Sequence, residues 1–257
     1  MKLSSVSKSS VCTQEASPSR WHSFWLWLGV AIVAALLVLV GRSAAAQTKR
    51  GIEVIELAMA LEPNLRQGRA IYREHCASCH GKSALGNATE VIPALAGQIP
   101  LYLVKELVDV AEADRVLPDM HRLLARKALA TPQALRDVAT YLSKLPPNSE
   151  PENGNGAQLV RGQQYYEGLC AFCHGQQAEG NPEHATPALQ RQHYSYLLMQ
   201  MRQMAVGHRY SVDTVVIEKL EALPLDYVEA IADYASRLPG KSAESVSDPR
   251  ALQPAED

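Results

Sequence analysis

Cys76-Ala77-Ser78-Cys79-His80 recurs further along the chain as Cys170-Ala171-Phe172-Cys173-His174. Each stretch has two cysteines separated by two residues and followed directly by a histidine. C-x-x-C-H is the attachment site of a c-type haem. The two thiols add across the vinyl groups of the porphyrin, and the histidine gives a nitrogen to the iron. The sequence therefore predicts two covalently bound haem c groups.

A zinc site or a redox-active dithiol is the alternative interpretation of a C-x-x-C pair. Both copies here also share the histidine and a following glycine, Gly81 or Gly175. This double match favours haem attachment, since an imidazole directly beside the second cysteine suits a tetrahedral zinc cage poorly. The predicted attachment residues are Cys76, Cys79, Cys170 and Cys173, and the predicted iron ligands on the proximal side are His80 and His174.

Composition limits the classes of function. The chain has 257 residues, five cysteines and a formal net charge of −2. Four cysteines belong to the two motifs, which leaves none for structural disulfides in the mature domains. The net charge gives no sign of nucleic-acid binding. We expect the covalent haems to stabilise domains that are short for an unaided core.

The N-terminal segment is predicted to direct export. Phe24 to Val40 is an almost unbroken apolar run, preceded by Arg20 and followed by Ser43-Ala44-Ala45-Ala46-Gln47. This pattern is typical of a secretory signal peptide that is cleaved after Ala46. The run also nears the length that spans a bilayer, so an uncleaved inner-membrane anchor is the alternative for residues 1–46. Either way, we expect the remainder of the chain in the periplasm.

The chain contains an internal repeat. Residues 52–147 and 157–239 form two predicted haem domains, joined by a Pro-, Gly- and Asn-rich linker at 148–156, and residues 240–257 are a predicted flexible tail. Matching segments lie in the same order in both copies: Gly86-Asn87 and Gly180-Asn181, Pro93-Ala94-Leu95 and Pro187-Ala188-Leu189, Gln98 and Gln192, Tyr102-Leu103 and Tyr196-Leu197, and Arg115 and Arg209.

Each repeat is predicted to be helical, so the fold class is all-α. Asn64 to His75 leads into the first haem motif, and Tyr102 to Ala113 has apolar residues at helical spacing. Thr131-Pro132 has the N-cap and N1 proline that open a helix, and Leu225-Asp226 opens its counterpart in the second repeat.

The sixth ligand of the first iron is predicted to be Met120. Met120 lies well beyond the motif, in a predicted loop between two helices that can fold over the haem. A thioether is a common haem ligand and raises the reduction potential. The neighbouring His121 is the competing ligand.

The second repeat departs from this pattern. Alignment of Arg115 with Arg209 places Thr214 opposite Met120, and no Met or His follows His208. His208 is therefore one candidate ligand of the second iron, and an open or water-bound iron is the other. The remaining upstream candidates are Met199, Met201, Met204 and His193. Met201 and Met204 match Leu107 and Val110 and are expected to fill the core.

Two pairs of residues have predicted supporting roles. Pro93 and Pro187 lie at matching places after the motifs, and their carbonyls are expected to accept the N–H of the proximal histidines. Arg115 and Arg209 are candidates for neutralising haem propionates, although an exposed arginine is the alternative.

With these features the chain resembles the two-domain dihaem class I cytochromes c, the cytochrome c4 group. The resemblance covers about residues 60–240. It implies two tandem cytochrome c domains, each a small helical bundle around one covalent haem. It also assigns His80 and Met120 to haem 1 and His174 to haem 2. Thr214 stands where that group has its second methionine.

The resemblance implies an electron carrier rather than an enzyme. We expect it to accept electrons from a quinol-oxidising complex or a dehydrogenase and to pass them to a terminal oxidase of the respiratory chain. One alternative is a haem enzyme in which an open haem 2 acts on a small ligand. Another is the cytochrome subunit of a dehydrogenase.

Overall fold

The structure, a computed structural model, describes residues 27, 28, 30, 32, 33, 49–112, 115, 117–124, 129, 131–209 and 212–239. Over these residues the regular secondary structure is helical, and two isolated antiparallel bridges join Asn87 to Ile92 and Asn181 to Thr186. The predicted all-α class is confirmed. Residues 49–257 belong to one compact unit and residues 1–48 to another.

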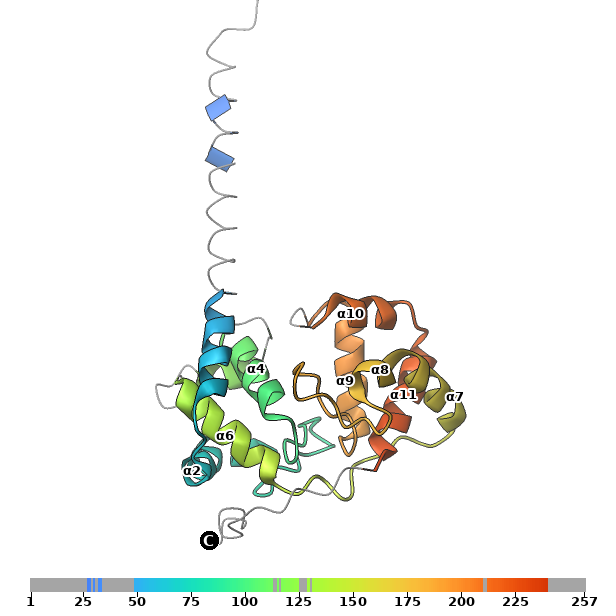
Figure 1. The fold of residues 1–257 in the computed structure, drawn as a ribbon. Coiled ribbons are helices and arrows are strands. Elements are labelled where there is room, and N and C mark those ends of the chain that lie inside the picture. The colour runs from blue at the N-terminus through green and yellow to red at the C-terminus, as the bar shows by residue number, and fades with distance from the viewer. Residues whose placement is uncertain are drawn as a thin grey trace, which may run out of the picture. The chain divides into compact units, whose positions relative to one another are not determined.

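The described residues of the first repeat form five helices, after a helical segment at residues 49–60. They are α2 (Leu65–His75), α3 (Ala77–His80), α4 (Pro100–Ala111), α5 (Pro118–Leu124) and α6 (Pro132–Lys144). α2 and α4 pack against α6 (Figure 1). The predicted start of α6 is confirmed, because the backbone N–H of Ala134 donates to the Thr131 hydroxyl at 3.2 Å.

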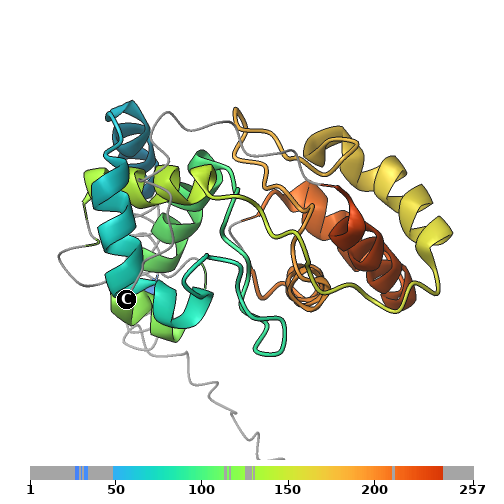
Figure 2. The ribbon, with the colours of Figure 1, turned by 90° about the horizontal axis from the view of Figure 1, so that it is seen from below.

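The second repeat has the same order of helices. They are α7 (Leu159–Tyr165), the π-helix η1 (Tyr166–Cys170), α8 (Ala171–His174), α9 (Tyr194–Ala205), α10 (Thr214–Glu221) and α11 (Leu225–Arg237). α7 and α9 pack against α11 (Figure 2). The segment that precedes the haem motif therefore differs between repeats: it is α-helical in α2 but continues from α7 as a π-helix in the second copy.

A glycine at each principal helix crossing explains how closely the helices approach. A Cβ atom on Gly68 would lie 2.1 Å from the carbonyl oxygen of Asp137 in α6, and one on Gly162 would lie 2.2 Å from that of Ala230 in α11. Backbone atoms cannot move aside cheaply at such distances. The two glycines thus fix the packing of the helix that leads into each haem motif.

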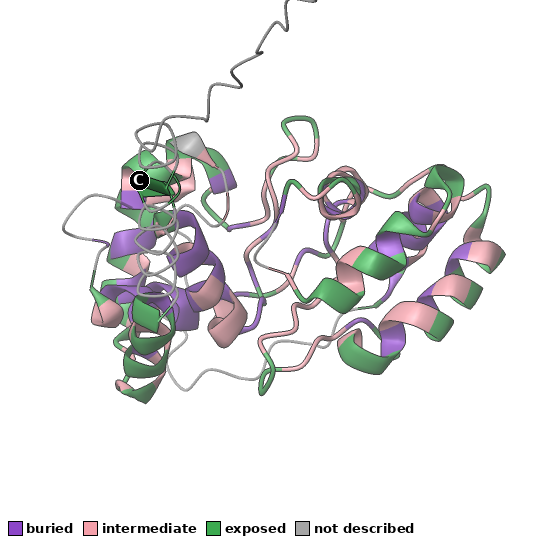
Figure 3. Ribbon diagram, turned by 90° about the horizontal axis from the view of Figure 1, so that it is seen from above, coloured by how far each residue is buried: buried purple, intermediate pink, exposed green. Residues whose placement is uncertain are grey.

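Each repeat has its own hydrophobic core. The buried residues gather on the inner faces of the helices (Figure 3). The first core includes Ile71, Tyr72, Val104, Leu135, Val138 and Leu142. The second includes Tyr166, Leu197, Met201, Val228, Ile231 and Leu238. Met201 therefore fills the core as predicted.

The predicted linker contacts the second repeat. The N–H of Glu152 donates to Nδ1 of His193 at 3.1 Å, and that of Gly156 donates to the Asp233 carboxylate at 2.7 Å. Arg237 in turn donates to the carbonyl of Gly154 at 2.7 Å. The segment has no core of its own, but it is held against α9 and α11.

The signal or anchor segment and the flexible tail are predicted at the two ends of the chain, where the structure describes few residues. Most of the predicted signal or anchor segment and all of residues 240–257 lie outside the described residues. Within the described part of the chain, no helix is both long and apolar enough to cross a membrane. Export, cleavage and anchoring stay predictions.

Candidate haem sites

The two motifs adopt the same local structure. α3 and α8 are single helical turns that carry the second cysteine and the histidine, while the first cysteine occupies the N-cap position. Residues three and four apart lie on one face of such a turn, so both thiols and the imidazole are neighbours. Gly81 and Gly175 end the turns with φ of 79° and 81°, a conformation that favours glycine.

The four motif cysteines form no disulfide with one another. Burial, followed by the neighbouring Cys79, raises the pKa of Cys76 to about 12. Burial likewise raises the pKa of Cys170 to about 11, although Lys219 opposes it. Two cysteine side chains on one face of a single helical turn suit covalent attachment to a porphyrin.

Each motif histidine has one ring nitrogen fixed by a hydrogen bond to the backbone. Nδ1 of His80 lies 3.1 Å from the carbonyl oxygen of Pro93, and Nδ1 of His174 lies 2.9 Å from that of Pro187. A carbonyl oxygen only accepts, so Nδ1 carries the proton and Nε2 keeps its lone pair. The predicted role of the two prolines as acceptors is confirmed.

Burial keeps both histidines neutral. It lowers the pKa of His80 and of His174, and the hydrogen bonds to the proline carbonyls offset this only in part. A neutral imidazole with a free Nε2 is the form that binds haem iron. The residues of both motifs therefore fit a covalently attached haem.

Two buried tyrosines support the motifs, a role that the repeat did not reveal. The hydroxyl of Tyr72 donates to the carbonyl of Gly81 at 2.6 Å, and that of Tyr166 donates to Gly175 at 2.7 Å. Both side chains are fully buried. Each tyrosine ties the preceding helix to the end of the haem-binding turn. Their equal spacing from the cysteines was the available sequence signal.

Met120 lies in a helix rather than in the predicted loop. It is the third residue of α5, is half-buried and packs against the same core as Cys76. The adjacent His121 is exposed. Leu123 is half-buried and Leu124 is buried, so this short helix has an apolar side where the proline and aspartate had suggested a loop.

The corresponding helix of the second repeat changes the alignment. Thr214 is exposed at the first position of α10, where the Asp213 carboxylate accepts from the N–H of Val215. The third residue, Val216, is half-buried and packs against the second core. Val216 is thus the structural counterpart of Met120, because α10 begins two residues later after Arg209 than α5 does after Arg115.

The other candidate ligands of the second iron differ in exposure and in their contacts. His208 is exposed, and Tyr210 and Ser211 lie outside the described residues. Met204 is half-buried and packs against the second core. His193 is buried, with Nε2 donating to the carbonyl of Leu85 at 2.8 Å and Nδ1 accepting from Glu152.

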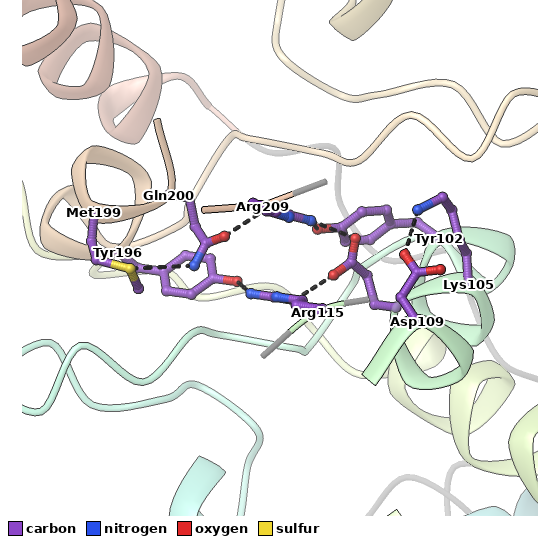
Figure 4. Close-up of polar contacts among 9 residues, drawn as sticks. Tyr102, Lys105, Asp109, Arg115, Tyr196, Met199, Gln200 and Arg209 are labelled. Carbon is purple, nitrogen blue, oxygen red and sulfur yellow. Dashed lines mark hydrogen bonds and ion pairs between the residues drawn. The ribbon is translucent and has the colours of Figure 1, made fainter. Parts of the chain in front are cut away.

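The side chain of Met199 has a polar contact of its own. Its sulfur lies 3.4 Å from Nε2 of Gln200 (Figure 4). With this contact, and with both nitrogens of His193 engaged, we assign neither residue to the second iron.

A buried ionic network joins the two repeats (Figure 4). Arg115 and Arg209 both pair with the carboxylate of Glu106. Arg115 also donates to the hydroxyl of Tyr196 at 2.9 Å, and Arg209 donates to that of Tyr102 at 3.3 Å. Each arginine therefore reaches a tyrosine of the other repeat. Their predicted contact with haem propionates stays a prediction.

The network is symmetric in position but not in charge. Burial raises the pKa of Glu106, but Arg209 and Arg115 outweigh this effect and hold the pKa below its usual range. Glu106 is therefore ionised at neutral pH. The equivalent position holds the neutral Gln200, which accepts from Arg209 at 2.7 Å. Two arginines thus share one carboxylate.

Comparison with known proteins decides the family. Residues 63–142 match the family described as cytochrome c oxidase, cbb3-type, subunit III. Cytochrome c4 of Pseudomonas aeruginosa is 30% identical over 171 residues, which cover 63% of this chain and 83% of that protein. The chain belongs to the cytochrome c4 group. This group comprises dihaem class I cytochromes c, as the sequence predicted.

Two further relatives extend the comparison. The thiosulfate dehydrogenase electron acceptor of Stutzerimonas stutzeri is 28% identical over 199 residues, or 70% of this chain and 90% of that protein. The crystal structure of reduced cytochrome c4 from Pseudomonas stutzeri superimposes with a TM-score of 0.61 at 24% identity, covering 69% of this chain and 100% of that one. The fold is that of two class I cytochrome c domains. The present chain, as a member of the cytochrome c4 group, carries two covalently bound haem c groups and transfers electrons.

Proposed function

We propose that Cys76 and Cys79 attach haem 1, and that His80 and Met120 are its axial ligands. Haem 2 is attached through Cys170 and Cys173 and held by His174. The supporting observation is the geometry that both motifs share: a neutral imidazole with its Nδ1–H bound to a proline carbonyl and its Nε2 free. That arrangement orients a proximal ligand and increases its basicity.

The protein acts in this proposal as a periplasmic carrier of single electrons. The donor is a quinol-oxidising complex or a dehydrogenase, and the acceptor is a terminal oxidase. Similarity to a thiosulfate dehydrogenase electron acceptor supports a dehydrogenase as donor. The match to a cbb3-type oxidase subunit supports an oxidase as acceptor.

Replacement of Met120 by alanine tests the assignment of haem 1. The native protein is expected to take up two electrons per chain in two one-electron steps. Met120→Ala is expected to lower the midpoint of one step by on the order of 100 mV, because the thioether favours ferrous iron. It also removes the charge-transfer absorption of methionine-bound ferric haem. Spectroelectrochemical titration measures both effects.

Met59→Ala is the matched control for this variant. Met59 is also half-buried in the first core, but its sulfur accepts from Arg136 at 3.5 Å. It is expected to leave both midpoints unchanged. The assignment is wrong if Met120→Ala keeps both midpoints and the charge-transfer band.

A second candidate function is binding of a small ligand at haem 2. The observation that favours it is Val216, an aliphatic side chain at the helix position where the first repeat has Met120. Valine offers no ligand atom, and His208 is exposed. A distal side on which the described helix α10 presents valine in place of methionine suits small neutral molecules such as carbon monoxide or nitric oxide.

Carbon monoxide binding to the reduced protein tests this candidate. One of the two ferrous haems is expected to bind carbon monoxide in the native protein, as followed by its Soret spectrum. Val216→Met is expected to abolish this binding by supplying a sixth ligand. Val215→Met is the control, because Val215 is 50% exposed on the same helix.

The outcome separates the two candidates for haem 2. If the native protein ignores carbon monoxide but His208→Ala binds it, His208 is the sixth ligand and haem 2 only relays electrons. Binding in the native protein that Val216→Met removes and Val215→Met preserves establishes the open site.

A further inference from the structure

Two buried glutamines cross between the repeats in a symmetric arrangement. Oε1 of Gln98 accepts from the N–H of Ala188 at 2.9 Å, and its Nε2 donates to the carbonyl of Ala188 at 3.0 Å. Gln192 makes the same two contacts with Ala94, both at 2.9 Å. Each glutamine therefore binds a backbone segment of the other repeat through both ends of its amide.

The orientation of each amide is fixed on its own side as well. Oε1 of Gln98 also accepts from the N–H of Ile99 at 2.9 Å, and Oε1 of Gln192 accepts from that of His193 at 3.1 Å. The two glutamines are 8% and 7% exposed. Buried amides with these contacts have a defined geometry, because an alternative orientation would leave polar groups unpaired.

The backbone amide that each glutamine binds also contacts a proximal histidine. The N–H of Ala188 and the carbonyl of Pro187 belong to one planar peptide group, and that carbonyl accepts from Nδ1 of His174 at 2.9 Å. Similarly, the peptide between Pro93 and Ala94 accepts from His80 and donates to Gln192. Each glutamine thus reaches the histidine of the other repeat through a single peptide.

We propose that Gln98 is a positioning residue for haem 2 and Gln192 for haem 1, so that docking of the repeats sets both haem potentials. This inference rests on the proposed assignment of His80 and His174 as proximal ligands. The peptide N–H donates a hydrogen bond to the glutamine oxygen. This bond polarises the peptide group and makes its carbonyl oxygen a stronger acceptor. A stronger bond to Nδ1–H makes the imidazole a better donor to iron, which favours the ferric state.

The expected result is a crossed effect of single substitutions in the holoprotein. Gln98→Leu removes the acceptor for Ala188, weakens the bond at His174 and raises the potential of haem 2 alone. Gln192→Leu raises the potential of haem 1 alone. The reduced-to-oxidised ratio of the affected haem, at a fixed applied potential, is expected to rise about threefold to tenfold, the effect of one ordinary hydrogen bond. Each midpoint is assigned to a haem by combining either variant with Met120→Ala. The step that Met120→Ala lowers belongs to haem 1, and the other step belongs to haem 2.

Amide hydrogen exchange gives a readout that does not depend on the haem assignment. Exchange at Ala188 is expected to accelerate in Gln98→Leu while exchange at Ala94 is unchanged, and the reverse is expected in Gln192→Leu. Ser195→Ala is the control, because the Ser195 hydroxyl donates to the carbonyl of Ala88 across the same contact at 3.1 Å without touching either peptide. It is expected to leave both potentials unchanged.

The possible outcomes separate this inference from the proposed function. Three results would overturn the crossed positioning. The first is a shifted midpoint potential of the haem in the same repeat as the substituted glutamine, and the second is an equal shift of both midpoint potentials. The third is the expected change in amide exchange with both midpoint potentials unchanged. In those cases the native protein still shows two one-electron steps. If the native protein itself lacks those steps, the proposed electron carrier is wrong.

Discussion

A chain in which Cys170 and Cys173 are both alanine is expected to lose haem 2 and to carry one haem instead of two. The double variant Cys76→Ala and Cys79→Ala is expected to lose haem 1 and to keep haem 2. Without its thiols the second motif cannot form the bonds that hold the porphyrin, and a bundle this small depends on that apolar body for much of its core. We therefore expect the second repeat to lose its helical structure. The mass of the intact exported protein and its haem content measure the first effect, and far-UV circular dichroism measures the second.

Phe172→Ser is the control for the paired cysteine variants. Phe172 lies between the two cysteines and is 97% exposed, and serine occupies the equivalent place in the first motif. This variant is expected to keep two haems and its full helical signal. Two haems in the chain without Cys170 and Cys173, or free thiols in the native protein, would refute covalent attachment at these motifs.

Gly162→Ala is expected to lower the free energy of unfolding of the holoprotein by about 2 kcal/mol or more. Alanine favours a helix over glycine by about 1 kcal/mol. The added Cβ would nevertheless lie 2.2 Å from the carbonyl oxygen of Ala230 and 2.9 Å from Cβ of Tyr234. α7 must then move away from α11, and the helix that precedes the haem motif loses its close packing. Chemical denaturation followed by circular dichroism measures the change.

Gly168→Ala is the matched control in the same segment. A Cβ on Gly168 meets no atom within 4 Å, and the first repeat has Glu74 at this position. The free energy of unfolding is expected to stay the same or to rise by up to about 1 kcal/mol. Equal destabilisation by the two substitutions would show that helix propensity, rather than the close crossing, governs the effect.

Several helices could be predicted because their signals are local. Thr131 and Pro132 start α6 as an N-cap and a first-turn proline, and the predicted first helix agrees with α2 to within one residue at its start. The π-helix η1 and the short helix that carries Met120 were not predicted. A π-helix differs from an α-helix by one residue in its hydrogen bonding, which apolar spacing over five residues cannot reveal.

The alignment at the distal helices shows the limit of matching segments by sequence. Counting from Arg115 and Arg209 placed Thr214 opposite Met120, whereas the helix starts place Val216 there. The two repeats differ in the length of this connection, and length changes in a connection leave no residue pattern of their own. Only the helix position shows that an aliphatic side chain replaces the methionine.

The sequence by itself determined the chemistry of the two motifs and the helical class, because each of these depends on residues within a few positions of one another. It also determined the repeat, because the same short segments recur in the same order. The tertiary structure decided which groups act together across the chain: Glu106 between two arginines, and each glutamine bound to the peptide beside the other repeat's histidine. Those partners are separated by up to 103 residues. Burial and backbone geometry bring them together, and neither leaves a spacing that can be read along the chain.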